Sequence, residues 1–489
     1  MTDLTTPRPD RAEIESVVRL VAERALDYLE SLDSRPVLGN RVGEAVASFS
    51  MPLPEYGTGA SDTIEMLLDR GLDASAATSG PRCFHFVIGG VTPAALAADW
   101  VTSLLDQPAY TWISSPLGVE LEVLGIAWLK DLFDLPSTWT GVMTSGATMS
   151  NVVGLASARQ WWAERHGADV AECGFAGLPS VPVFSSGYLH ASSVKGLSLL
   201  GIGRSSARTF ACDAAGRLDL VALEDALRRL DGAPAILIGN AGEVNTGGFD
   251  PIEQLADLAE RYRAWLHVDG AFGLFARVSP RLRHLTTGVE RADSVAADGH
   301  KWLNVPYDSG FAFVRDARFL TSTFAYTAAY LPDPDDPRPT MGGMMPQSSR
   351  RARALAVWAT LHAYGRSGYR ELVEHHVELA AHLARLVDSA PDLERLDEVP
   401  LNIVCFRYNP GGIPGEALND INRRIGDLIL TDGRVFAGTT VHRGDVALRP
   451  AIVNWRTERG DVELFVNVVR ELGRTALQEA RQVNVRSDV

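Results

Sequence analysis

Apolar positions recur at helical spacing in the first part of the chain. Residues 11–33 carry a broad apolar stripe that predicts an amphipathic helix. Thr92 followed by Pro93 is a typical helix start, with threonine as the N-cap and proline at the first helical position. Residues 117–133 repeat apolar side chains with the same period, so we expect three helices before the chain reaches residue 140.

Between residues 140 and 316 the pattern changes to short apolar runs that alternate with helical segments. The runs predict buried strands at residues 181–184, 235–238, 265–268, 294–296 and 311–314. Helices are predicted at residues 149–165, 219–230 and 251–264. This alternation is typical of an α/β domain around a mostly parallel sheet. In such sheets, ligands bind at the carboxyl ends of the strands.

The last third of the chain predicts a second, smaller unit. A turn-rich segment at residues 332–339 is followed by a long helical stretch at 347–387. The later pattern predicts strands at 400–407 and 446–454, a helix at 415–428, and a closing helix. We therefore divide the chain into an N-terminal helical segment (1–90), a large α/β domain (91–345) and a small α+β domain (346–489).

Composition excludes several classes of protein. Hydrophobic residues make up 46% and charged residues 22% of the 489 positions, as is ordinary for a globular protein. The net charge of −15 argues against a nucleic-acid or membrane surface. The four cysteines show neither paired nor metal-ligand spacing, which favours reduced thiols. No signal peptide or membrane-spanning run is evident, so we expect a soluble cytoplasmic protein without a metal site.

Two residues that end apolar runs, Asp269 and Lys301, suit one kind of cofactor chemistry. A lysine amine condenses with an aldehyde cofactor, and a buried carboxylate keeps a pyridine nitrogen protonated so that the ring accepts electrons. A lone Lys or Asp is usually a solvated surface charge. Lys301, however, is flanked by His300 and Trp302 instead of by other charges. The pair therefore indicates a pyridoxal phosphate (PLP) site.

The remaining parts of such a site have candidates nearby. Small or hydroxyl-bearing residues open the helix predicted near residue 149: Ser145, Gly146, Ala147 and Thr148. Backbone N–H groups at a helix N-terminus suit a phosphate, although an ordinary capping turn is the alternative. His190 can stack on a pyridine ring, and Ala271 can cover the other ring face. His300 suits proton transfer or phosphate contact, with a turn-fixing hydrogen bond as the alternative.

Taken together, these motifs resemble the group II PLP-dependent amino-acid decarboxylases, the family of the aromatic-L-amino-acid and glutamate decarboxylases. The most specific segments are residues 144–151, 190–193, 242–251, 267–271 and 298–302. Further matching segments are residues 81–84, 115–122, 349–351 and 448–449. The resemblance covers roughly residues 50–470 in the right order, which chance similarity explains poorly.

The resemblance implies an α/β protein of PLP fold type I, with a mostly parallel seven-stranded sheet, helices on both faces and a small α+β C-terminal domain. It implies a homodimer in which residues 1–90 pack on the partner. It also implies that Lys301 carries PLP as an imine, that Asp269 pairs with the ring nitrogen, and that His190 stacks on the ring. The same resemblance makes Ala147 and Thr148 phosphate ligands, with His300 beside them, and Thr246 a neighbour of the cofactor. The implied reaction is loss of CO2 from an L-amino acid to give an amine.

One departure from the family concerns the proton that replaces CO2. Family decarboxylases supply it from a tyrosine on a mobile loop, and relatives that lack this tyrosine act as aldehyde synthases. The corresponding stretch here, residues 339–345, is short and has no tyrosine. Tyr330 is the nearest candidate and Tyr326 is another, with packing as the alternative role of each.

The substrate pocket has weaker candidates. Phe84, His85 and Trp112 match positions that line the pocket in the family, which favours an aromatic or bulky amino acid, with core packing as the alternative. Arg449 is a candidate partner of a substrate carboxylate, or of an internal salt bridge. The main hypothesis is thus a PLP-dependent L-amino-acid decarboxylase. The alternatives are an aldehyde synthase or other α-carbon lyase, and a PLP-binding relative without catalysis.

Overall fold

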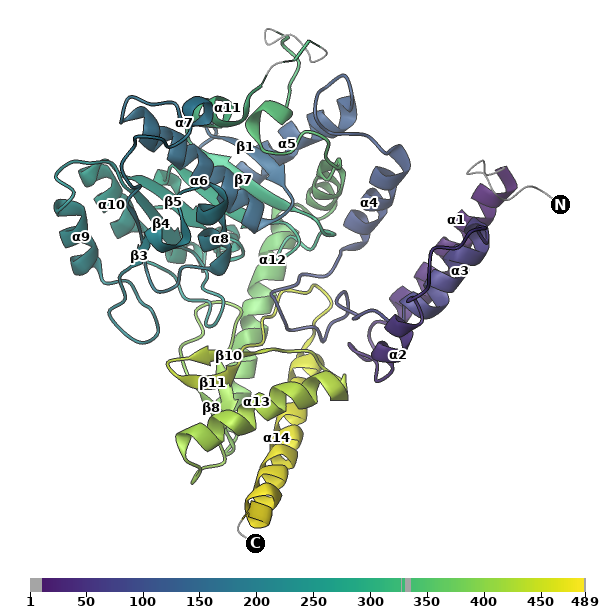
Figure 1. The fold of residues 1–489 in the computed structure, drawn as a ribbon. Helices are drawn as coiled ribbons and strands as arrows, with labels where there is room; N and C mark the ends of the chain where they lie inside the picture. Colours follow the sequence, from purple (N-terminus) through teal and green to yellow (C-terminus); the bar gives the residue numbers. More distant parts are fainter. Residues whose placement is uncertain (1–10, 327, 330–335, 488–489) are drawn as a thin grey trace.

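The computed structural model describes residues 11–326, 328–329 and 336–487. Its centre is a seven-stranded sheet with the order β1-β7-β6-β5-β4-β2-β3 (Figure 1). The strands are β1 (Thr140–Thr144), β2 (Val183–Ser185), β3 (Ala207–Thr209), β4 (Ile236–Asn240), β5 (Trp265–Asp269), β6 (Ser294–Asp298) and β7 (Gly310–Val314). All five predicted strands are therefore present. The edge strand β3 was not predicted, because its sequence Ala-Arg-Thr is partly exposed and carries no apolar run.

Strand direction brings three polar strand ends to one edge of this sheet. β3, β2, β4, β5 and β6 are parallel to one another, whereas β7 is antiparallel to both β6 and β1. The predicted fold class, a mostly parallel sheet with helices on both faces, is confirmed. Asn240, Asp269 and Asp298 are the last residues of β4, β5 and β6. Because these strands are parallel, their three polar ends lie at the same edge.

Helices cover both faces of the sheet. Along the chain the helices are α1 (Arg11–Ser31), α2 (Val42–Ala47), α3 (Ala60–Gly71), α4 (Pro93–Leu105), α5 (Pro116–Leu132), α6 (Ala147–Glu164), α7 (Val170–Cys173), α8 (Ala191–Leu199), α9 (Leu220–Arg228), α10 (Ile252–Tyr262), α11 (Arg318–Phe324), α12 (Ala354–Ser389), α13 (Gly415–Asp432) and α14 (Arg459–Ser487). One apolar cluster joins one face of the sheet to α6, α8 and α11, and a second joins the other face to α5, α9, α10 and α12.

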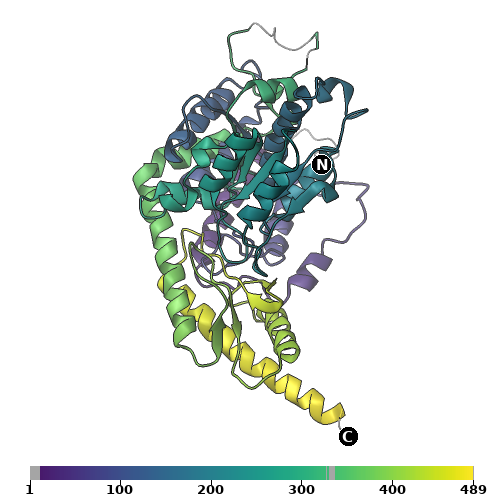
Figure 2. The same ribbon diagram turned by 90° about the vertical axis from the view of Figure 1, so that its left-hand side faces the viewer.

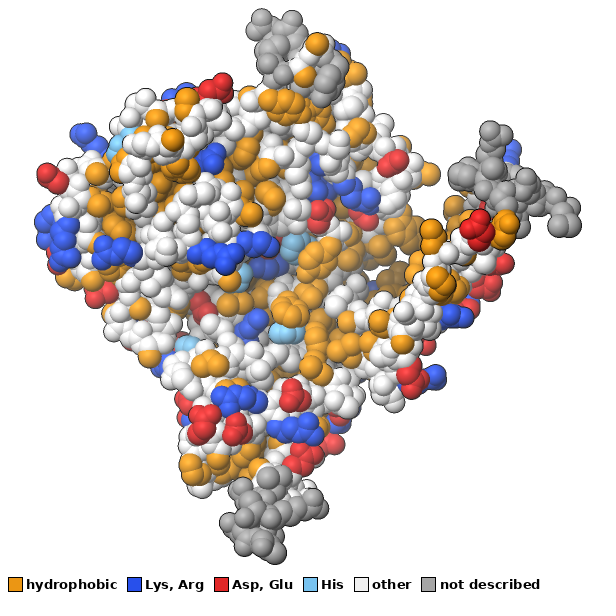
Figure 3. Space-filling view, viewed as in Figure 1, with side chains coloured by type: hydrophobic (Ala, Val, Ile, Leu, Met, Phe, Trp, Pro, Cys, Tyr) orange, Lys and Arg blue, Asp and Glu red, His pale blue; other side chains and the backbone are white. Residues whose placement is uncertain are grey.

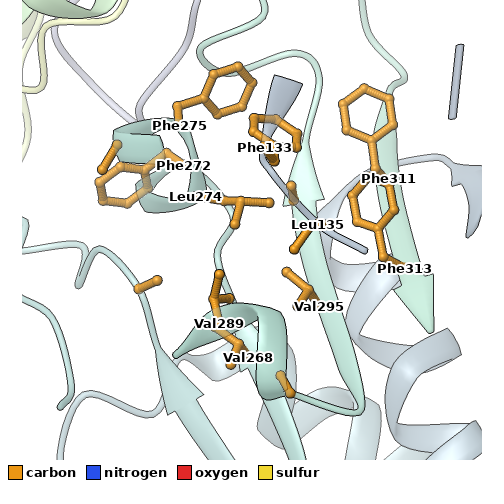
Figure 4. Close-up of a cluster of buried hydrophobic side chains, with 14 of the residues drawn as sticks. Phe133, Leu135, Val268, Phe272, Leu274, Phe275, Val289, Val295, Phe311 and Phe313 are labelled. Carbon is orange, nitrogen blue, oxygen red and sulfur yellow. The ribbon is translucent and has the colours of Figure 1, made fainter. Parts of the chain in front are cut away.

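Strand β5 shows how side chains are divided between these two faces. Val268 lies in the cluster of Figure 4, together with Phe133, Phe311 and Phe313. Trp265 belongs to the cluster on the opposite face, which α6 covers. Because side chains alternate along a strand, His267 and Asp269 share the face of Trp265 and also point toward α6.

The C-terminal part is a smaller α+β unit, as the sequence predicts. Its sheet has the order β10-β11-β9-β8. The strands are β8 (Leu393–Arg395), β9 (Phe406–Tyr408), β10 (Thr439–His442) and β11 (Asp445–Leu448), and α12, α13 and α14 pack against them. The two strands predicted here are shorter than expected. Residues 401–405 are buried without forming a strand: Val404 N–H bonds to the Pro450 carbonyl, and Pro450 has no N–H to return that bond.

Two predicted helix starts need correction. The helical stretch expected from residue 347 begins at Ala354, and Gly365, with φ of 60°, interrupts it. Thr92 lies at the N-cap of α4 as predicted, but its side chain does not cap the helix. Its Oγ1 instead lies 2.9 Å from Oγ1 of Thr360, in a bond that joins α4 to α12.

Helices α1, α2 and α3 form an arm that stands apart from the body of the molecule (Figures 1 and 2). None of the side chains in these three helices is buried. Hydrophobic side chains are visible on the arm and on the part of the body that it faces (Figure 3). Apolar surface of this extent is typical of an interaction site.

Candidate active site

A pocket of about 250 Å³ opens at the sheet edge where β4, β5 and β6 end. Nine of the ten residues predicted around the cofactor line it: Ser145, Gly146, Ala147, Thr148, His190, Asp269, Ala271, His300 and Lys301. They come from the start of α6, the start of α8, and the segments that follow β5 and β6. The structure thus brings together residues that lie up to 156 positions apart in the sequence (301 − 145).

Lys301 lies in the turn after β6, next to an acid that sequence reasoning missed. Its Nζ is 3.2 Å from Oδ2 of Asp298, and it lies 5.5 Å from the centre of the Phe272 ring. The other oxygen, Oδ1, accepts a 2.5 Å hydrogen bond from the Ala147 N–H and lies 3.4 Å from Nε2 of His300. A single buried carboxylate therefore joins the lysine, the histidine and the first turn of α6.

Asp269 is held by neutral donors. Its Oδ2 accepts hydrogen bonds from Asn151 Nδ2 at 2.8 Å and from Ser193 Oγ at 3.4 Å. Its Oδ1 accepts from the Ala271 N–H at 3.2 Å. The side chain is buried but lines the pocket, so the carboxylate is fixed and still faces the cavity. Asn151 is a second residue that sequence reasoning did not single out.

The two pocket histidines are oriented by their Nδ1 atoms. Nδ1 of His190 accepts a hydrogen bond from the Ser192 N–H at 3.2 Å and lies 2.7 Å from its hydroxyl. Nδ1 of His300 accepts from the Ser309 N–H at 3.3 Å, and its ring stacks on Tyr307 at 4.2 Å. Burial lowers the pKa of both histidines, against the opposing effect of Asp269 on His190 and of Asp298 on His300. Both rings are therefore neutral at pH 7, with Nε2 carrying the proton.

The loop before α6 depends on glycines at close approaches. Gly146 has φ of 143°, and a Cβ at this position would lie 2.9 Å from Cε1 of His300. A Cβ on Gly310 would lie 2.5 Å from the backbone of Gly146. The Thr144 hydroxyl accepts a 3.3 Å hydrogen bond from the Gly146 N–H. The loop therefore packs tightly against β7 and presents the N-terminus of α6 to the pocket.

The other candidate residues lie farther from the cavity. Thr246 does not line it, since its hydroxyl bonds to Glu243, which does. Phe84 packs on Phe465 in the C-terminal core, with 5.1 Å between the ring centres. Its role in the structure is therefore core packing, the alternative to lining the substrate pocket. Trp112 donates to Glu120 on an exposed segment and does not reach the pocket.

His85 and Arg449 are half-buried near the site, although neither lines the cavity. Burial lowers the pKa of His85 to about 4, and the charge of Arg449 contributes to this shift. Arg449 also affects the pKa of His190. In the part of the chain that the structure describes, His85 Nδ1 and Arg449 Nη1 are buried without a hydrogen-bond partner. Arg449 forms no ion pair with a described carboxylate, so the internal salt bridge considered above is not present there.

Of the two candidate proton donors, Tyr326 does not line the cavity. Tyr326 bonds through its hydroxyl to Tyr110 at 2.9 Å and to Ser348 at 2.7 Å. Tyr330 lies outside the described residues. Tyr307 lines the pocket, and the sequence offered a signal for it, because it follows the Lys301 motif by only six residues (307 − 301).

Comparison with known proteins decides the family. The pyridoxal-dependent decarboxylase conserved domain matches residues 62–409. The chain belongs to this family. It is 28% identical over 447 residues to an aromatic-L-amino-acid decarboxylase of Bacillus atrophaeus, covering 88% of this chain and 89% of the relative. It is 30% identical over 489 residues to an acidic amino acid decarboxylase of Mus musculus, covering 94% and 86%.

The fold of the enzyme agrees with this assignment. The crystal structure of Oryza sativa TDC with PLP and tryptamine superposes with a TM-score of 0.89 at 26% identity, covering 96% of this chain and 99% of the other. The enzyme is therefore a PLP-dependent decarboxylase of PLP fold type I. Among the described residues, no helix could span a membrane, and no group of His, Cys, Asp and Glu side chains is arranged for a metal ion.

Proposed function

We propose that the enzyme removes CO2 from the α-carbon of an aromatic L-amino acid and releases the amine, with Lys301, Asp269 and His190 at the reacting centre. The observation that carries the proposal is their convergence on one pocket with the N-terminus of α6. An amine, a carboxylate, a flat ring and backbone N–H donors match the aldehyde, ring nitrogen, ring face and phosphate of PLP. The donor set therefore fits the cofactor.

Each side chain has a distinct task in this proposal. PLP, when bound, supplies a pyridinium ring that accepts the electrons left behind as CO2 departs. Asp269 holds a fixed negative charge for the ring nitrogen. His190 presents its Nε2–H to the pocket, because Nδ1 is occupied by Ser192. Asp298 holds the Lys301 amine at 3.2 Å, within the cavity.

For the substrate, we propose that the unpartnered Nη1 of Arg449 binds a carboxylate and that His85 lies beside it. A buried guanidinium nitrogen without a partner is costly, so a ligand oxygen that bonds to it gains affinity. The aromatic side chains Phe272, Tyr188 and Tyr307 line the cavity and favour an aromatic substrate. The aromatic-L-amino-acid decarboxylase among its relatives supports the same choice.

We also propose that two copies pair in the cytoplasm through residues 1–90, which include the arm formed by α1, α2 and α3. Large apolar side chains are exposed on the arm and on α4: Val18 at 62%, Leu26 at 62%, Leu53 at 96% and Leu104 at 82%. An arm without buried side chains gains stability only when its apolar face is covered. A second copy, presenting the same surface, is the partner that symmetry favours.

An aldehyde synthase on the same scaffold is the second candidate function. It is favoured by the stretch 339–345, which has no tyrosine, and by the hydroxyl of Tyr326, which is engaged away from the cavity. Such an enzyme consumes O2 and water and releases CO2, ammonia, H2O2 and an aldehyde. Without a proton donor from this stretch, the α-carbon would be open to oxidation.

A panel of L-amino acids separates these functions. Purified enzyme loaded with PLP is assayed for CO2, amine, aldehyde and H2O2 with aromatic, acidic and basic substrates. We expect CO2 and amine in equal amounts, with the largest kcat/KM for an aromatic substrate. Aldehyde and H2O2 without amine would refute the decarboxylase proposal. Bound cofactor without turnover of any substrate would identify a relative that has lost catalysis.

A further inference from the structure

A chain of hydrogen bonds runs behind Asp269, through side chains that do not line the pocket. Asn151 on α6 donates from Nδ2 to Oδ2 of Asp269 at 2.8 Å. Nε2 of His267, on β5, lies 2.9 Å from Oδ1 of the same asparagine. Nδ1 of His267 lies 2.8 Å from Oγ of Ser294, and Trp265 Nε1 donates to that Oγ at 2.9 Å. All five side chains are buried.

The direction of this chain is fixed at Asp269, because an ionised carboxylate can only accept. Asn151 presents its amide nitrogen to Asp269 and its Oδ1 to Nε2 of His267, so Nδ1 of a neutral His267 must accept. Ser294 accepts from Trp265 and gives its single hydrogen to Nδ1 of His267. A neutral His267 then carries its proton on Nε2 and donates to Oδ1 of Asn151. The bond from His267 holds the amide nitrogen of Asn151 toward Asp269. The flipped amide would place two oxygens against each other and leave the carboxylate without this donor.

Packing keeps the His267 ring in place. Gly154 lies three residues after Asn151, on the same face of α6. A Cβ at position 154 would lie 2.7 Å from both Nδ1 and Cε1 of His267, and 3.1 Å from Oγ of Ser294. Burial also lowers the pKa of His267, against the opposing charge of Asp269, so the ring is neutral. Only a glycine at position 154 leaves room for the His267 ring.

We propose that His267 and Asn151 are positioning residues that hold the Asp269 carboxylate toward the cofactor ring without neutralising it. A lysine or arginine in their place would compensate the negative charge and compete with the ring nitrogen for it. A neutral donor fixes the orientation of the carboxylate and leaves its full charge for the pyridinium. The inference deepens the proposed function, because it rests on the proposed pairing of Asp269 with the cofactor.

The test replaces each positioning residue and observes the ring nitrogen directly. His267→Phe keeps a flat ring but removes both hydrogen bonds, and Asn151→Ala only removes atoms. Each variant is loaded with PLP labelled with ¹⁵N in the ring, and the NMR signal reports whether that nitrogen is protonated. We expect a shift toward the unprotonated form. We also expect kcat to fall by about 10-fold to 100-fold, the value of a hydrogen bond to a charged group, with KM nearly unchanged.

His376→Phe is the matched control. His376 is buried and makes two ring hydrogen bonds, with Trp302 Nε1 at 2.9 Å and the Asn454 carbonyl at 3.0 Å, but it does not contact Asp269. The same substitution there should destabilise the protein and leave the ¹⁵N signal unchanged. A wild-type signal and kcat in Asn151→Ala would overturn the inference, even where His267→Phe does not fold. An equal shift of the signal in the control would also overturn it.

Two further outcomes separate this inference from the proposed function. A shifted signal in Asp269→Asn, together with wild-type enzyme that decarboxylates nothing, overturns the function and leaves the positioning role standing. An unshifted signal in Asp269→Asn removes the partner on which the positioning role acts and overturns both.

Discussion

Removing Arg350 should destabilise the large domain more than any surface substitution. Arg350 and Glu122 form a buried ion pair, each side chain only 1% exposed, with nitrogen–oxygen distances of 2.5 and 3.0 Å. The guanidinium also donates to the carbonyls of Ala109 at 2.8 Å and Met143 at 2.9 Å. In Arg350→Met the carboxylate and both carbonyls lose these donors. Breaking a buried pair by removing one partner costs about 3–5 kcal/mol, and we expect a loss within that range.

The assay is equilibrium unfolding of the apoprotein in urea, followed by tryptophan fluorescence at a fixed protein concentration. A carboxylate left without its cation escapes by taking up a proton, so the destabilisation should be smaller at pH 5 than at pH 7. The double variant Glu122→Leu/Arg350→Met should be more stable than the sum of the single losses predicts. Arg423→Met, in an exposed ion pair on α13, is the control and should have little effect. A loss in Arg350→Met no larger than in this control would refute the reasoning.

Three further predictions concern the cofactor and pH. Lys301→Ala should abolish the visible absorbance of protein-bound PLP, and retained absorbance would mean that another lysine holds it. Gly310→Ala, whose Cβ would meet the Gly146 backbone at 2.5 Å, should weaken PLP binding at least tenfold by equilibrium dialysis, whereas Gly460→Ala, with open space around it, should not. Burial lowers the pKa of His376 from 6.5 to about 3, so between these values the unfolded chain binds a proton that the folded protein does not. The free energy of unfolding of the wild type therefore decreases as the pH is lowered below about 6.5. The loss of stability caused by His376→Phe should be smaller at pH 5 than at pH 7 by about 2 kcal/mol, as measured by urea unfolding. An equal loss at both pH values would contradict this.

The sequence predicted those parts of the fold in which a strand is buried on both faces. Such strands are continuous apolar runs, and the polar residue that ends a run marks the sheet edge where ligands bind. Asp269 could be recognised in this way, and Lys301 by its unusual neighbours. Asp298 meets the same criterion, since it is the last residue of β6. Because Asp298 also begins the motif that contains Lys301, the sequence did not single it out as a separate site residue.

The C-terminal sheet was harder to predict for a physical reason. Its strands are three or four residues long, too short for an alternating pattern to be distinguished. In addition, Pro450, which has no N–H to donate, interrupts the pairing between the segment after β11 and residues 401–405. Residues 401–405, four of which are apolar, therefore predicted a strand; they are buried, but they form only an isolated bridge, between Ile403 and Ala451.

Strand β5 explains why Asn151 could not be found from the sequence and why Asp269 could. Leu266 and Val268 face the apolar cluster, whereas His267 and Asp269 face α6. Side chains that build the core therefore alternate along β5 with side chains that serve the site. The face of α6 that meets them must be polar and small at once, as Asn151 and Gly154 are. Most of α6 is buried on all sides, so it shows no amphipathic pattern that would mark this face. The role of a polar residue in such a helix depends on the strand that packs against it. The sequence does not show which strand that is, so the role of Asn151 could not be predicted.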